Sequence, residues 1–127
     1  MDHYDPDVTL GAKEWLALDE GERLVLVEGY HRDARIALPR TARRFHATIH
    51  TIVENQLALN DEPVVGALGR LMKEGLNRHD AVHTVGSVVA EHINDLFRLK
   101  DSPETSHAQY YAAIERLTVA EWQKNFG

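Results

Sequence analysis

The chain has 127 residues, enough for one domain with a single core and too few for two. Hydrophobic residues make up 43% of it and charged residues 27%, proportions that exclude a disordered or fibrous chain. The formal charge of −6 argues against nucleic-acid binding, and the absence of cysteine excludes disulfides and thiolate zinc sites. We therefore expect one folded domain spanning residues 1–127, in which any metal is bound by nitrogen and oxygen.

The sequence shows no targeting or membrane-spanning segment. Its first residues, MDHYDPDVTL, lack the basic start and the apolar run of a signal peptide. No apolar stretch approaches the ~18 residues that a helix needs to cross a bilayer. The sequence thus predicts a cytoplasmic protein without membrane or nucleic-acid partners.

Apolar residues recur at helical spacing along the chain and predict about five helices. Asp19 and Glu22 have the form of a capping box, which opens a first helix over about residues 20–32. Before it, Trp15 is expected in a short turn that packs its ring onto the core. A second helix follows over about residues 41–59, begun by a threonine that can cap it and carrying isoleucine and valine on one face.

The remaining helices follow the same pattern. A third is expected over about residues 63–75, between a proline and a glycine. Asn77 can cap the fourth and longest, over 78–99, and a fifth covers 102–117, before a last short turn at 118–121. Because no alternating strand pattern of useful length appears, the sequence predicts an all-α, single-domain helical bundle.

Two pairs of histidines are the most informative feature. His46 with His50, and His79 with His83, are each four residues apart, so the two side chains of a pair project from the same side of a helix. Both pairs fall at the edge of an apolar stripe, and Gly86, in line with the second pair, would let a neighbouring helix come close. We expect the two pairs to face each other between two helices that up-and-down packing would run parallel.

This constellation predicts a divalent metal site. Neutral imidazole is a ligand of zinc, iron and nickel, and two to four of them with a carboxylate form a common ligand set. Glu54, expected to point toward solvent, and Glu91 are the favoured carboxylates, with Asp80 and Glu28 as further candidates. Glu28 precedes His31 by three residues, a spacing that di-iron bundles use twice and that occurs here once.

Two alternatives remain open at this point. Histidines at a core edge often donate one hydrogen bond to a carbonyl and accept one from water, as in a non-catalytic structural or interaction module, which we would expect to be a homodimer. A metal-dependent hydrolase would instead use a glutamate as the base toward a metal-bound water. A separation of the histidine pairs beyond about 10 Å would exclude both metal hypotheses. The chain's other histidines, His3, His92 and His107, are expected on surface or polar faces.

Residues 15–92 resemble a family of small, uncharacterised bacterial proteins known as a domain of unknown function. The resemblance rests on the segments WLALDEGERLVLVEGYHR, FHATIHTIVENQLALND and RLMKEGLNRHDAVHTVGSVVAEH. It includes the spacing of His46, His50, His79, His83 and Glu91. Because that family has no established activity, the resemblance implies no mechanism.

A local similarity to the HD phosphohydrolases is also present. Those helical enzymes use a histidine followed at a distance by adjacent histidine and aspartate, and His50 with His79 and Asp80 is similar to that. For their later aspartate only Asp95 and Asp101 are available, and the chain is short for that fold.

Hemerythrins share another part of the pattern. They carry a histidine and a glutamate four residues apart and then a histidine pair, which His50 with Glu54 and His79 with His83 resemble. Histidines that could complete such a set are His31 and His107. Position 112, where the pattern wants an aspartate, is alanine, so the similarity is one of local spacing and not of fold.

Overall fold

The computed structural model describes residues 1–33, 40–98 and 103–126, and within these ranges it is all-α, as predicted. Its helices are α1 (Ala12–Ala17), α2 (Glu20–Asp33), α3 (Arg40–Ala58), α4 (Glu62–Lys73), α5 (Arg78–Phe97), α6 (Pro103–Arg116) and α7 (Val119–Phe126). The described ranges hold seven helices instead of about five, because the turns expected near Trp15 and after residue 117 are short helices. None of the described helices is long and apolar enough to cross a membrane.

Side-chain hydrogen bonds confirm two of the predicted helix starts. At α2, the Glu22 amide donates to Asp19 Oδ1 at 2.8 Å and the Asp19 amide donates to Glu22 Oε1 at 3.1 Å, which completes the capping box. At α5, the Asp80 amide donates to Asn77 Oδ1 at 2.8 Å. The cap predicted from the threonine at position 41 and the helix start predicted at residue 102 fall outside the described side chains.

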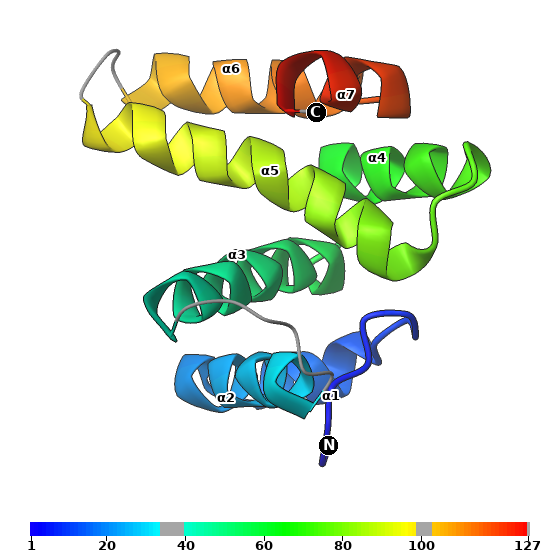
Figure 1. The fold of residues 1–127 in the computed structure, drawn as a ribbon, viewed down its shortest axis with the longest axis vertical. Helices are drawn as coiled ribbons and strands as arrows, with labels where there is room; N and C mark the ends of the chain where they lie inside the picture. The colour runs from blue at the N-terminus through cyan, green and yellow to red at the C-terminus, as the bar shows by residue number, and fades with distance from the viewer. Residues whose placement is uncertain (34–39, 99–102, 127) are drawn as a thin grey trace.

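The helices stack in layers, with α3 between the two halves of the molecule (Figure 1). One side of α3 contacts α1 and α2, and the other contacts α4 and α5, which carry α6 and α7 beyond them. A larger apolar cluster lies among α3, α4, α5 and α6, and a smaller one joins the N-terminal segment, α1, α2 and α3. Buried members of the smaller cluster are Tyr4, Trp15, Val27 and Ala47. Helix α3 therefore belongs to both cores.

Helices α3 and α5 run antiparallel, so the parallel arrangement expected from up-and-down packing is wrong. Residues late in α3 contact residues early in α5: His46 lies against His83, whereas Glu54 pairs with Arg78. The chain does reverse between α4 and α5, where Gly75 at φ 110° closes α4 with a Schellman motif. It does not reverse between α3 and α4, so the chain turns back once between α3 and α5 instead of twice.

Gly86 allows α3 to approach α5 closely. A Cβ atom at this position would lie 2.9 Å from Ile49 Cγ2 and 4.0 Å from Val53 Cγ2. All three residues are buried, so there is no free space into which the contact could relax. The expectation that a small residue in line with His79 and His83 permits a close helix is confirmed.

The contact at Gly86 predicts opposite effects of adding one methyl group at two helical glycines. Gly86→Ala should lower the free energy of unfolding by roughly 1–3 kcal/mol, because the β-branched Ile49 cannot move away. Gly69→Ala on α4, where a Cβ meets nothing within 4 Å, should raise it by up to about 1 kcal/mol through helix propensity. Urea denaturation of the two variants checks this, and equal stability of both would contradict the close approach.

Candidate metal centre

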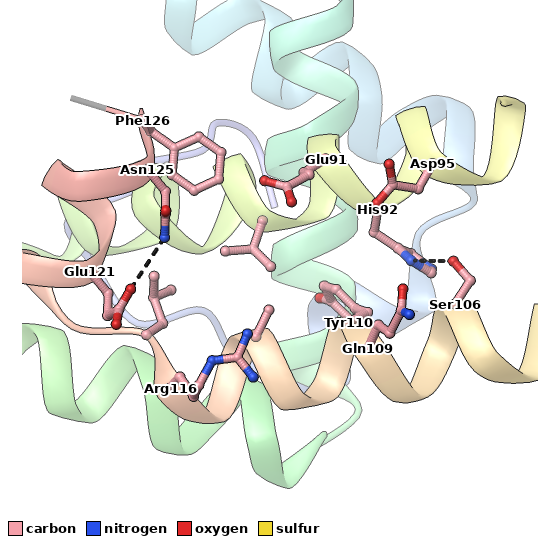
Figure 2. Close-up of a pocket in the computed structure, with 13 residues that line it drawn as sticks. Glu91, His92, Asp95, Ser106, Gln109, Tyr110, Arg116, Glu121, Asn125 and Phe126 are labelled. Atoms are coloured by element: carbon pink, nitrogen blue, oxygen red, sulfur yellow. Dashed lines mark hydrogen bonds between the residues drawn. The ribbon is translucent and has the colours of Figure 1, made fainter. Parts of the chain in front are cut away.

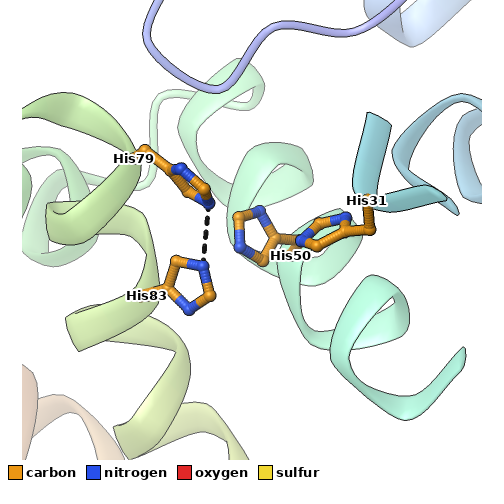
Figure 3. A group of neighbouring side chains, drawn as sticks. All are labelled: His31, His50, His79 and His83. Atoms are coloured by element: carbon orange, nitrogen blue, oxygen red, sulfur yellow. Dashed lines mark hydrogen bonds between the residues drawn. The ribbon is translucent and has the colours of Figure 1, made fainter. Parts of the chain in front are cut away.

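Four histidines from three helices meet where α2, α3 and α5 adjoin (Figure 3). They are His31 on α2, His50 on α3, and His79 and His83 on α5, and one ring nitrogen of each lies within 4.8 Å of the others. His31 and His50 are buried, whereas His79 and His83 are half-buried. Bonds of about 2.0–2.1 Å to a tetrahedral ion place ligand nitrogens roughly 3.3 Å apart, so small side-chain rotations would suffice to bring all four to one metal.

A fifth imidazole, that of His46, borders this group without belonging to it. Its ring centroid lies 4.4 Å from that of His83 and 4.6 Å from that of His31. The ring of His50 is also 4.4 Å from that of His83. The two predicted pairs thus face each other far inside the limit of about 10 Å set by the length of metal–nitrogen bonds.

Three nitrogens at this junction are buried and have no hydrogen-bond partner among the described residues: Nε2 of His31, of His46 and of His50. Leaving a buried polar atom unpaired costs about 1–3 kcal/mol, and folded proteins contain few such atoms. A purely structural histidine would have both ring nitrogens satisfied. Three unpaired nitrogens on adjoining rings therefore form an arrangement that can accept a cation.

The remaining ring contacts indicate where two of the protons lie. His31 Nδ1 is 2.8 Å from the Val27 carbonyl, which can only accept, so the ring carries its proton on Nδ1 and directs a lone pair from Nε2. His79 Nε2 and His83 Nε2 are 2.8 Å apart and share one hydrogen, drawn as a dashed line in Figure 3. The Tyr30 hydroxyl lies 3.4 Å from His79 Nδ1. A metal between the rings would replace the shared hydrogen.

Burial keeps four rings, those of His31, His46, His50 and His83, neutral, which is the form that binds metals. Desolvation, followed by repulsion from the neighbouring imidazoles, lowers the pKa of His46 to about 4 and that of His83 to about 3. Burial also lowers the pKa of His31 and of His50. At neutral pH these four rings therefore offer lone pairs without first losing a proton.

Glu54 was expected to point toward solvent, but it is buried beside the histidines. Its Oε1 accepts from Arg78 Nη2 at 2.7 Å, and its Oε2 accepts from Arg78 Nη1 at 2.8 Å and from the Tyr4 hydroxyl at 2.5 Å. Arg78 thus forms a buried ion pair with Glu54. Burial alone would lower the pKa of Arg78, but the hydrogen bonds and charge of Glu54 raise it overall.

The N-terminal segment, in which no sequence pattern predicted a role, covers this ion pair. Tyr4 is buried, and its hydroxyl lies 3.3 Å from His50 Nδ1; burial and the charge of Glu54 raise its pKa. The Pro6 carbonyl accepts from Arg78 Nη1 at 2.9 Å. One residue later, Asp7 Oδ1 accepts from the His79 amide at 3.1 Å. The segment therefore contacts residues of both α3 and α5 at the histidine centre.

Glu91, the other predicted carboxylate, is exposed and lies away from the four histidines. It lines a pocket of about 490 Å³ among α5, α6 and α7 (Figure 2). His92 faces the same pocket, where its Nδ1 is 3.2 Å from Ser106 Oγ and its ring stacks on Tyr110. The polar environment expected for His92 is confirmed, and His3 and His107 are exposed as expected.

His31 is the member of the group that spacing did not select. The sequence named it as a histidine that could complete a hemerythrin-like set, and for its distance from Glu28, whose Oε1 instead lies 3.3 Å from Arg44 Nε. A lone histidine on a helix has no chelating partner four residues away, so no local pattern marks it. Only the packing of α2 against α3 brings His31 to His50, with ring centroids 4.9 Å apart.

No protein-family model matches this chain, and neither a curated protein nor a solved structure is significantly similar to it. The resemblance to a domain of unknown function and the local similarities to hemerythrins and HD phosphohydrolases therefore stay predictions. A function is therefore inferred from the chemistry of the histidine centre.

Lowering the pH should destabilise the metal-free protein. The unfolded chain binds protons near the ordinary histidine pKa of 6.5, whereas the folded chain resists them down to a pKa of about 4 at His46 and about 3 at His83. Stability present above pH 6.5 is thus lost progressively below it, by up to about 1.4 kcal/mol per pH unit for each neutral histidine, and less where the ring is half-exposed.

Urea midpoints measured with a chelator at pH 7.5, 6 and 5 check this expectation. His46→Gln should flatten the dependence on pH, whereas His107→Gln, which removes an exposed imidazole, should leave it unchanged. A midpoint that stays constant from pH 7.5 to 5 would contradict it.

The buried ion pair predicts a large effect of removing one partner. Arg78→Met leaves the Glu54 carboxylate buried without a cation and should cost about 3–5 kcal/mol of unfolding free energy. Arg70→Met is the matched control and should cost about 1–2 kcal/mol, because among the described residues Arg70 donates to the carbonyls of Ile114 and Leu117 and pairs with no carboxylate. The double variant E54Q/R78M should recover part of the loss. Equal denaturation midpoints for R78M and R70M would show that the pair is not buried as described.

Proposed function

We propose that this protein binds one divalent transition metal ion through His31, His50, His79 and His83. The observation that carries the proposal is the convergence of four ring nitrogens within 4.8 Å, contributed by three different helices. The unpaired Nε2 atoms of His31 and His50 support it, since these are the lone pairs that a cation would use. A divalent ion would supply Lewis acidity and a coordination centre at this junction.

The donor set favours particular metals. Imidazole nitrogen suits zinc, iron and nickel, whereas magnesium and calcium prefer oxygen ligands. Within the described ranges, the group that could hold an ion contains histidines alone and no carboxylate. We therefore expect zinc, nickel or iron to bind, and magnesium and calcium not to compete.

His46 has a secondary place in the proposed centre. Its unpaired Nε2 and its proximity to His83 make it a fifth nitrogen donor that a rotation of the side chain would bring into use. Zinc sites expand from four to five ligands during catalysis, and octahedral iron or nickel accepts more than four nitrogens. The five-histidine cluster thus suits a metal of variable coordination number.

The two carboxylates expected from the sequence have other surroundings in the structure. Both oxygens of Glu54 accept hydrogen bonds, from Arg78 and Tyr4. Glu91 lines the pocket among α5, α6 and α7. In the part of the chain that is described, no glutamate joins the four-nitrogen group as a base toward bound water. The proposal is accordingly metal binding, without an assigned reaction.

Metal analysis of protein purified without a polyhistidine tag tests the proposal. We expect one zinc, nickel or iron ion per chain, and a rise in unfolding free energy of about 2.7 kcal/mol when free metal is a hundred times the dissociation constant. His50→Ala and His83→Ala should each weaken binding by roughly 100-fold or more, because each removes one of four ligands.

The matched controls are His92→Ala and His107→Ala, which remove histidines outside the group and should leave affinity unchanged. Protein that holds no metal, and whose melting temperature does not move with zinc, nickel, iron or manganese, would disprove the proposal. The same would follow if the control variants lost as much affinity as H50A and H83A, since binding would then occur elsewhere on the chain.

A further inference from the structure

We propose that Tyr4 is a positioning residue of the metal centre, whose hydroxyl fixes His50 with its proton on Nδ1 and so leaves Nε2 free for the metal. The expected effect of Tyr4 on metal affinity rests on the proposed metal binding. The tautomer itself is a property of the metal-free protein and can be measured there.

The position of the Tyr4 hydroxyl is fixed by its surroundings. Although it is close to the start of the chain, Tyr4 is only 2% exposed. Its ring contacts those of Trp15 and Tyr30, each with centroids 6.0 Å apart, in the smaller apolar cluster. A tyrosine packed in this way cannot turn its hydroxyl to another partner without leaving the core.

The single proton of that hydroxyl is used in a hydrogen bond to Glu54. Tyr4 donates to Glu54 Oε2 at 2.5 Å, and the Glu54 carboxylate faces the guanidinium of Arg78 through two further hydrogen bonds. A carboxylate held by a guanidinium is an acceptor only. The direction of the Tyr4–Glu54 bond is therefore set, and only lone pairs of the Tyr4 oxygen face other neighbours.

His50 must consequently donate to Tyr4. Its Nδ1 lies 3.3 Å from the Tyr4 oxygen, and a ring protonated on Nε2 would place two lone pairs opposite each other. With the proton on Nδ1, the lone pair of Nε2 is directed away from Tyr4. That Nε2 is buried and has no partner in the described part of the chain, and its ring centroid is 4.4 Å from that of His83.

The contacts form one chain from Arg78 through Glu54 and Tyr4 to His50. Partners of this kind behind a ligand fix its tautomer and raise its basicity, and changing them typically lowers metal affinity 10–100-fold. A bound cation would polarise the Nδ1–H of His50 and strengthen each bond behind it. Tyr4 is thus the link through which the buried carboxylate acts on the ligand.

Tyr4→Phe is the variant that tests this role, with zinc ions alone as the probe. Its zinc dissociation constant should rise 10–100-fold. Nitrogen-15 NMR of the metal-free protein should show His50 protonated on Nδ1 in the unmodified chain and as a mixture of tautomers in Y4F. Tyr110→Phe is the matched control, because Tyr110 is also buried and donates to Gln56 at 3.0 Å, away from the histidines. It should leave both the zinc affinity and the His50 tautomer unchanged.

Each outcome supports or overturns the proposal. His50 protonated on Nε2 in the unmodified protein would overturn it, as would equal zinc affinities for Y4F and Y110F. If the unmodified protein bound no zinc but His50 carried its proton on Nδ1 and lost this preference in Y4F, metal binding would fail while the role of Tyr4 stood. Should Y4F not fold, the tautomer of His50 in the unmodified chain still tests the proposal.

Discussion

The ion pair between Glu54 and Arg78 joins α3 to α5 and anchors the N-terminal segment at the same point. A buried pair of this kind is stable only when further hydrogen bonds satisfy its remaining atoms. Here the Tyr4 hydroxyl and the Pro6 carbonyl provide them. The first residues of the chain, the central helix and the longest helix are therefore held together by one charge pair, and the histidines lie directly beside it.

Most of the fold could be predicted because its signals are local. A capping box such as Asp19 with Glu22, or a cap such as Asn77, depends on residues three positions apart and works in any context. The relative direction of α3 and α5 was not predictable in this way. It depends on whether the turn after α3 reverses the chain, and no spacing along the sequence reports that.

The candidate site was predictable to the same extent. Two histidines one helical turn apart must project together, so His46 with His50 and His79 with His83 were visible as pairs. The proximity of Gly86 to Ile49 explains why the pairs meet. His31 and Tyr4 come from other parts of the chain and have no histidine one helical turn away. Glu54 was misplaced because helical periodicity assigned it to a solvent face, whereas the N-terminal segment and Arg78 cover it.

The proposed ligands lie on both sides of the boundary between the two apolar clusters. His31 is carried by α2, which packs in the smaller cluster, whereas His79 and His83 are carried by α5, which packs in the larger. An ion bound to all of them would join distant parts of the chain much as a disulfide does in a protein that contains cysteine. In this cysteine-free chain, such a cross-link could be opened by acid or by a chelator, without any reductant.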